Sequence, residues 1–174
     1  MTVIRMGKTI ALVSATALLL AACSKKEQVG AQVEEQQVQQ ERVKTAAELE
    51  IEQWGHPTAE GLAYYAGADR VFFAYDSSEL SGEARMTLDK QAQWLGHYGQ
   101  VSVTIEGHCD ERGTREYNLA LGDRRAQAVV NYLAAQGVSA DRLKSISYGK
   151  ERPAVVGNGE SAWGQNRRGV LAVD

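Results

Sequence analysis

The sequence of 174 residues is poor in the residues that build disulfide frameworks, metal sites and nucleic-acid surfaces. It contains two cysteines, which excludes a disulfide framework, so the fold must be held by a hydrophobic core. Its three histidines lie in distant segments, which argues against the three or four ligands of a zinc site. The net charge of −3 leaves no basic excess, which argues against a nucleic-acid partner.

The chain also lacks an apolar run of membrane-spanning length. The longest run covers residues 10–20 and follows Arg5 and Lys8. A spanning helix needs about 20 apolar residues, whereas a short apolar run after basic residues is typical of a secretory signal. We therefore expect residues 1–22 to be a signal peptide.

The signal ends in Leu20-Ala21-Ala22-Cys23, which resembles the lipobox of bacterial lipoproteins. In that pattern the cysteine is acylated and becomes the mature N-terminus, so Cys23 is the expected lipidation site. Several acyl chains would anchor the chain stably. The next residue is Ser24 and not aspartate, which in lipoproteins implies the outer membrane, with the domain facing the periplasm. An ordinary cleaved signal is the alternative.

Residues 23–57 differ in composition from the C-terminal part of the chain. The segment is rich in Gln and Glu, and its valines are too sparse for a packed core. We expect a solvated tether, with a short coiled coil as the alternative. Residues 58–174 are one domain's worth of chain and can bury a single core.

Hydrophobic periodicity and turn residues predict an α/β fold of the order β-α-β-α-β-α-β. The helices should pack on one mixed sheet whose first three strands are locally parallel, because they are joined by helical crossovers. The expected strands are residues 71–75, 100–106, 143–148 and 169–173, and the expected helices are residues 81–97, 114–136 and 161–167.

Charged residues of opposite sign follow the second expected strand. Asp110 lies in a loop bounded by Gly107 and Gly113, and Arg125 comes fifteen residues later on a helix. A carboxylate facing a guanidinium forms a receptor for a zwitterion, because the acid takes an ammonium group and the planar Arg fork takes a carboxylate through two bonds. Leu121, one turn before Arg125, should form an apolar floor.

Each of these residues also has a purely structural interpretation. Asp110 could bond backbone N–H groups of its own turn. Arg125 could pair with Asp123 or Glu111 on the helix surface. Arg124 points about 100° away from Arg125, so both cannot serve the same cleft.

Several spaced motifs resemble the OmpA-like peptidoglycan-binding domain, and the resemblance runs over residues 69–171. They are FAYDSS (73–78), GHCDERGTREYN (107–118), Leu121, residues 124–126, SYGKERPAV (147–155) and residues 166–168. The resemblance implies that Asp76, Asp110 and Arg125, with Leu121 and Gly113 beside them, contact the meso-diaminopimelate of the peptidoglycan stem. It further implies a non-enzymatic tether without cofactors, and as partners the β-propeller protein TolB and other Tol proteins, which serve envelope integrity and cell division. Ala74 departs from the family pattern, which usually has an acid there.

Two other classes of protein compete with this interpretation. An enzyme acting on cell-wall peptide could use His108, Cys109 and Asp110. However, adjacent residues at a strand end, such as His108 and Cys109, usually point to opposite sides. Cys109 is therefore expected to be a buried packing residue. A flagellar-stator type of protein would need a membrane-spanning helix in place of the lipobox.

Overall fold

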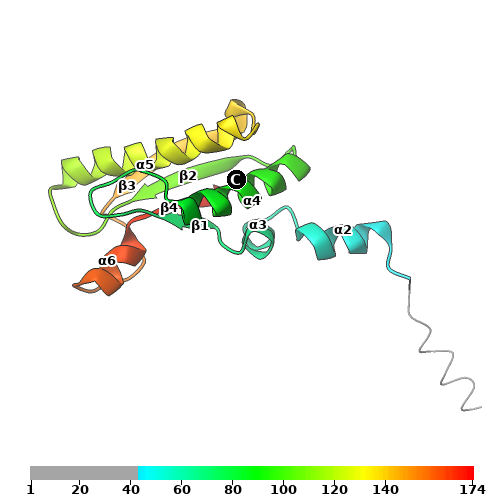
Figure 1. The fold of residues 1–174 in the computed structure, drawn as a ribbon, viewed down its shortest axis with the longest axis horizontal. Coiled ribbons are helices and arrows are strands. Elements are labelled where there is room, and N and C mark those ends of the chain that lie inside the picture. Colours follow the sequence, from blue (N-terminus) through cyan, green and yellow to red (C-terminus); the bar gives the residue numbers. More distant parts are fainter. Residues whose placement is uncertain (1–42) are drawn as a thin grey trace, which may run out of the picture. The chain divides into compact units, whose positions relative to one another are not determined.

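The computed structural model describes residues 43–174 (Figure 1). The expected signal peptide (residues 1–22), the lipidation site Cys23 and most of the expected tether lie outside the described residues. Residues from Thr45 to Asp174 form one compact unit. Among the described helices, none combines the length and the hydrophobicity that crossing a membrane requires.

Four strands form a mixed sheet in the order β1-β4-β2-β3. They are β1 (Arg70–Phe72), β2 (Val103–His108), β3 (Leu143–Gly149) and β4 (Arg168–Val173). β2 and β3 are parallel, and β4 is antiparallel to both β1 and β2. The first three strands therefore run in one direction, as predicted, and the last strand inserts between β1 and β2.

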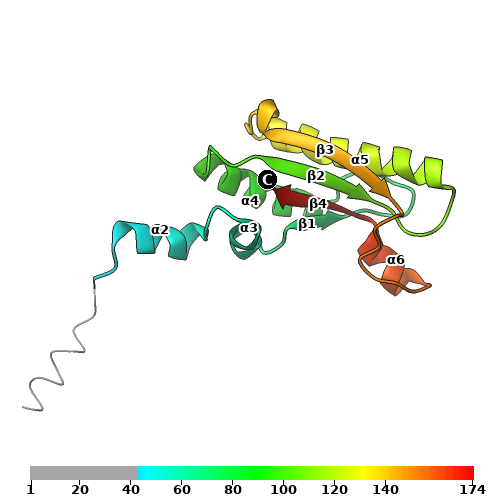
Figure 2. The ribbon, with the colours of Figure 1, turned by 180° about the vertical axis from the view of Figure 1, so that it is seen from behind.

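Two long helices cover one face of this sheet. They are α4 (Gly82–His97) and α5 (Arg115–Ala135), and each begins after a capping hydroxyl, Ser81 and Thr114 respectively. Their apolar sides pack on the alternate strand residues that point toward them, and in Figure 2 the strands lie in front of α5. The α/β fold with helices packed on one mixed sheet is confirmed. The centre of the core is made by Leu88, Leu95, Val103, Ile105, Ala126, Val129, Leu133 and Leu171.

Three shorter helices complete the compact unit. α6 (Glu160–Asn166) precedes β4 and was expected, whereas α2 (Ala46–Trp54) and α3 (Ala59–Ala66) precede β1 and were not. α2 begins with a capping box in which Thr45 and Glu48 satisfy each other's backbone N–H groups.

α2 is attached to the domain through its last turn. The ring of Trp54 stacks between Tyr65, at 4.7 Å, and His97, at 4.3 Å. The indole N–H of Trp94 donates to the carbonyl of Trp54 at 2.9 Å, and His97 meets Glu50 at 2.9 Å. These contacts, from side chains distant in sequence, extend the compact unit back to Thr45, beyond the expected boundary at residues 57/58.

Candidate functional site

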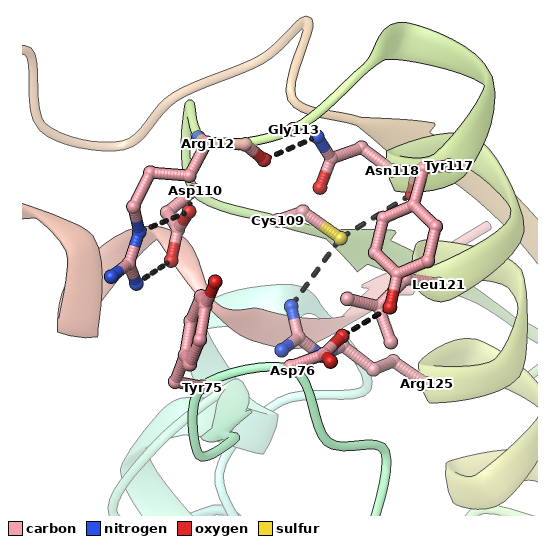
Figure 3. A pocket seen from close by; sticks show the side chains of 10 residues that line it. All are labelled: Tyr75, Asp76, Cys109, Asp110, Arg112, Gly113, Tyr117, Asn118, Leu121 and Arg125. Carbon is pink, nitrogen blue, oxygen red and sulfur yellow. Dashed lines mark hydrogen bonds and ion pairs between the residues drawn. The ribbon is translucent and has the colours of Figure 1, made fainter.

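A pocket of about 200 Å³ opens where β2 ends and α5 begins (Figure 3). Its walls come from the segment after β1, the loop after β2 and the first three turns of α5. The lining residues are Tyr75, Asp76, Cys109, Asp110, Arg112, Gly113, Tyr117, Asn118, Leu121 and Arg125. All five residues predicted for ligand binding are among them.

Close contact between α5 and β2 brings these segments together. A Cβ atom on Gly107 would lie 1.8 Å from the carbonyl oxygen of Gly122, so only glycine allows the helix to approach the strand this closely. Gly113 instead has φ +89, which glycine adopts without strain. Close approach therefore requires glycine at residue 107, and positive φ favours it at residue 113.

Asp110 is the most buried acid of the pocket, with an exposed fraction of 4%. Its carboxylate accepts hydrogen bonds from Arg112 Nε at 3.0 Å and Nη2 at 2.5 Å, and from the backbone N–H of Arg112 at 3.1 Å. Arg167 Nη1 lies 3.4 Å away. Burial opposes ionisation, but the bonds from Arg112 outweigh it and lower the pKa of Asp110 below its ordinary value. Asp110 therefore stabilises its own turn and is charged.

Arg112 was not singled out from the sequence, although it lies two residues after Asp110. Its guanidinium is sandwiched between the rings of Tyr75 and Trp163, 4.0 Å from each centroid. Trp163 also donates its indole N–H to Glu111 at 3.0 Å. The sandwich holds a partly exposed cation at the pocket mouth, and its rings come from segments that are distant in sequence.

Arg125 is fully buried below the pocket, with an exposed fraction of 0%. Its acceptors are Ser77 O at 2.8 Å, His108 O at 2.8 Å, Ala74 O at 3.0 Å and Cys109 Sγ at 3.3 Å. Four of its five N–H groups are thus engaged within the protein. Tertiary contacts thus use most of the donors that the expected two-bond fork would offer a ligand, and they leave one N–H group.

The alternative for Arg125, an ion pair on the helix surface, is wrong. The side chain points into the domain and bonds backbone carbonyls of the segment after β1. Burial lowers the pKa of Arg125 from its usual value. Arg124 is the exposed neighbour, as the helical geometry predicted.

Asp76 lies opposite Asp110 and is exposed. It is the one non-glycine residue with positive φ, +51, in the described part of the chain. Its carboxylate accepts a hydrogen bond from the hydroxyl of Tyr117, and this bond raises the pKa of Tyr117. Unusual backbone geometry that places a carboxylate at a pocket is a feature of binding sites.

Two further lining residues complete the pocket. Leu121 is buried on the α5 side of the pocket and supplies its apolar floor. Asn118 donates its side-chain amide to Arg112 O at 2.8 Å and Thr114 O at 3.0 Å, which ties the loop to the helix.

Comparison with known proteins identifies the family. The model of the OmpA family matches residues 72–167, which is more than half of the chain and includes every residue that lines the pocket. The chain belongs to the OmpA family.

Two relatives of this OmpA-family chain carry the same name. The chain is 57% identical over 106 residues to the peptidoglycan-associated lipoprotein of Brucella melitensis, and the match covers 61% of the chain and 63% of that relative. It is 45% identical over 124 residues to the protein of the same name from Haemophilus influenzae, covering 68% of the chain and 81% of the relative. The chain thus spans less than two thirds of the length of the Brucella protein.

A solved structure agrees with the fold of this OmpA-family domain. The peptidoglycan-associated lipoprotein from Burkholderia pseudomallei superposes with a TM-score of 0.60 at 40% identity, covering 62% of the chain and 92% of that protein. The backbone carbonyl of Ala74 accepts a hydrogen bond from Arg125 at 3.0 Å.

His108 and Cys109 separate to different sides of β2. Cys109 lines the pocket and donates to the carbonyl of Asn118 at 3.3 Å, and burial raises the pKa of its thiol. His108 is not a lining residue, and its ring lies beside Tyr148 and 3.4 Å from Glu106. Cys109 therefore has no imidazole beside it to act as a base, and its role as a buried packing residue is confirmed. Residues 43–174 contain no cluster of side chains suited to a metal ion.

Proposed function

We propose that this OmpA-family domain binds the peptide stem of peptidoglycan non-covalently, at the free end of meso-diaminopimelate. A lipid on Cys23 would hold the chain in the outer membrane with the domain in the periplasm, so that the protein tethers this membrane to the cell wall without catalysing a reaction. The names of the relatives support the ligand class. The observation that carries the proposal is a small pocket with carboxylates and guanidinium groups around one apolar floor.

The size of the pocket fits the end of one amino acid. A volume of 200 Å³ corresponds to about seven water molecules at roughly 30 Å³ each. The free end of diaminopimelate presents an α-carbon, an ammonium group, a carboxylate and the adjoining methylene groups, which is a similar number of heavy atoms. Leu121 would contact the methylene groups, while sugar rings would remain outside.

The charges fit both ends of a zwitterion. Asp76 and Asp110 lie on the pocket wall and can accept from the ligand ammonium. Arg112 lies at the mouth, and Arg125 keeps one N–H group beneath it. The ligand carboxylate would therefore meet Arg112 first and Arg125 through a single bond.

Binding requires an exchange of ion pairs. Asp110 is occupied by Arg112 in this structure, at 2.5 Å. An incoming ammonium would replace Arg112 on Asp110, and the ligand carboxylate would become the new partner of Arg112, which Tyr75 and Trp163 keep at the mouth. A simple amine or a simple carboxylate would leave one charge unpaired, so the exchange favours a zwitterion.

The free energies of hydrogen bonds to charged groups are large enough for this pocket to bind its ligand with micromolar affinity. A hydrogen bond to a charged group contributes about 1.5–3 kcal/mol, and three to four of them would reach the roughly 8 kcal/mol of a micromolar complex.

By family resemblance the partners would include TolB and other Tol proteins, with a role in envelope integrity and cell division.

Calorimetric titration of the compact unit, residues 45–174, tests the proposal with two muropeptides. One ends in meso-diaminopimelate and the other has lysine there, which keeps the ammonium but lacks the carboxylate. We expect only the first to bind, and Arg112→Ala to weaken it about tenfold to a hundredfold. Arg112→Lys should be intermediate, because it keeps the charge but loses the planar stack, and Arg124→Ala is the exposed control. Equal affinity for both muropeptides would refute carboxylate recognition.

A further inference from the structure

The sheet has a second face that the long helices leave uncovered (Figure 2). Strand alternation places on it the residues that point away from α4 and α5. We call this surface the open sheet face; it includes Phe72, Glu106, Ile146, Tyr148, Arg168 and Val170. None of them lines the pocket for the proposed ligand.

Apolar and charged side chains alternate across this face. Val170 on β4 pairs with Arg70 and Glu106, and Glu106 pairs in turn with Ile146 on the edge strand β3. Ile146 is 39% exposed and Phe72 is 48% exposed, although both lie on strands. Exposed apolar side chains on a regular sheet face provide contact area for a partner.

Two arginines lie at this face. Arg168 is only 7% exposed, and its Nε atom has no hydrogen-bond partner among the described residues. Arg152 is exposed and lies over the ring of Tyr148, 3.7 Å from its centroid. A buried guanidinium with an unpaired donor is costly, and a carboxylate from a partner that reached it would satisfy this donor.

The local charge is opposite to that of the whole chain. Burial together with Arg168, Arg152 and Arg70 lowers the pKa of His108 to about 4, which reflects the positive field at this end of the sheet. The chain as a whole has a net charge of −3. With Arg152 and Arg168 against Glu106, this end of the face is positively charged and suits an acidic partner.

We propose that the open sheet face binds a protein segment that carries carboxylates beside apolar side chains. Its carboxylates would bond the guanidinium groups of Arg168 and Arg152, which match carboxylate geometry. Its apolar side chains would cover Phe72 and Ile146. A bilayer surface fits less well, because Arg168 is recessed and a headgroup plane meets only exposed cations.

The test uses the full-length chain in nonionic detergent and fluorescence anisotropy of short extended peptides. The probes alternate valine with glutamate, with lysine or with serine. We expect the glutamate peptide to bind about tenfold more tightly than the other two, and more weakly as salt is added. Arg152→Glu and Ile146→Ser, both at exposed positions, should each weaken it about fivefold or more. Arg85→Glu, on the exposed side of α4, should change affinity by less than about twofold.

Several results would overturn the proposal. They are failure of the glutamate peptide to bind at about 1 mM, equal binding of the serine peptide, or equal loss with Arg85→Glu. Binding to phosphatidylglycerol vesicles that depends on Arg152, without binding of the glutamate peptide, would assign the face to lipid. Cell-wall sedimentation of the same variants should stay normal, which separates this proposal from the function proposed for the pocket.

Discussion

Replacing Arg125 with methionine separates a structural role from a ligand-binding role. The side chain joins the segment after β1 to the end of β2 through three carbonyls, those of Ala74, Ser77 and His108. Methionine fills a similar volume but donates no hydrogen bond. The buried carbonyl of His108 then lacks this donor, and the two strand ends lose their connection.

The magnitude follows from these contacts. A hydrogen bond to a charged group contributes about 1.5–3 kcal/mol, and breaking a buried charged network typically costs about 3–5 kcal/mol. We therefore expect Arg125→Met to lower the free energy of unfolding by about 3–5 kcal/mol. With a urea slope of about 2 kcal/mol per molar, the midpoint should fall by about 1.5–2.5 M.

The assay is urea unfolding of residues 45–174 followed by circular dichroism, with Arg124→Met as the matched control. Arg124 is exposed on the same helix, so its replacement should cost less than about 0.5 kcal/mol. Equal midpoints for the two variants, with cell-wall binding lost only in Arg125→Met, would show that Arg125 serves the ligand and not the fold.

Two further changes test other parts of the domain. Trp54→Ala removes two ring contacts, each worth about 0.5–1.5 kcal/mol. The amides of α2 should therefore exchange faster in hydrogen-exchange measurements, while muropeptide affinity is unchanged. Ile51→Ala is the exposed control, and unaltered exchange in Trp54→Ala would contradict the docking of α2. His108 has a pKa of about 4 in the folded protein against an ordinary value of 6.5, so the unfolded chain binds more protons between these values and stability should fall with acidification through that window. The loss approaches about 3 kcal/mol at the acid end, and His108→Asn should remove most of it in unfolding curves at about pH 7 and pH 4.5. An identical pH dependence of the two proteins would refute the assignment.

Local signals in the sequence determined the elements that depend on neighbouring residues. Ser81 and Thr114 marked the starts of α4 and α5, because a capping hydroxyl acts within one turn. The helical period likewise placed Leu121 one turn before Arg125, on the same side of α5. These features follow from backbone geometry, which repeats with the periods of helix and strand.

Tertiary structure alone decided which partners each charged side chain has. Arg112 is held between the rings of Tyr75 and Trp163. Arg125 donates hydrogen bonds to carbonyls about fifty residues earlier in the chain. The same holds for α2, whose Trp54 docks on distant rings. The sequence predicted the residue types of the pocket, because recognition of a zwitterion needs a carboxylate and a guanidinium. Packing decided which N–H donors remain for a ligand, because a buried N–H group bonds an acceptor within the protein.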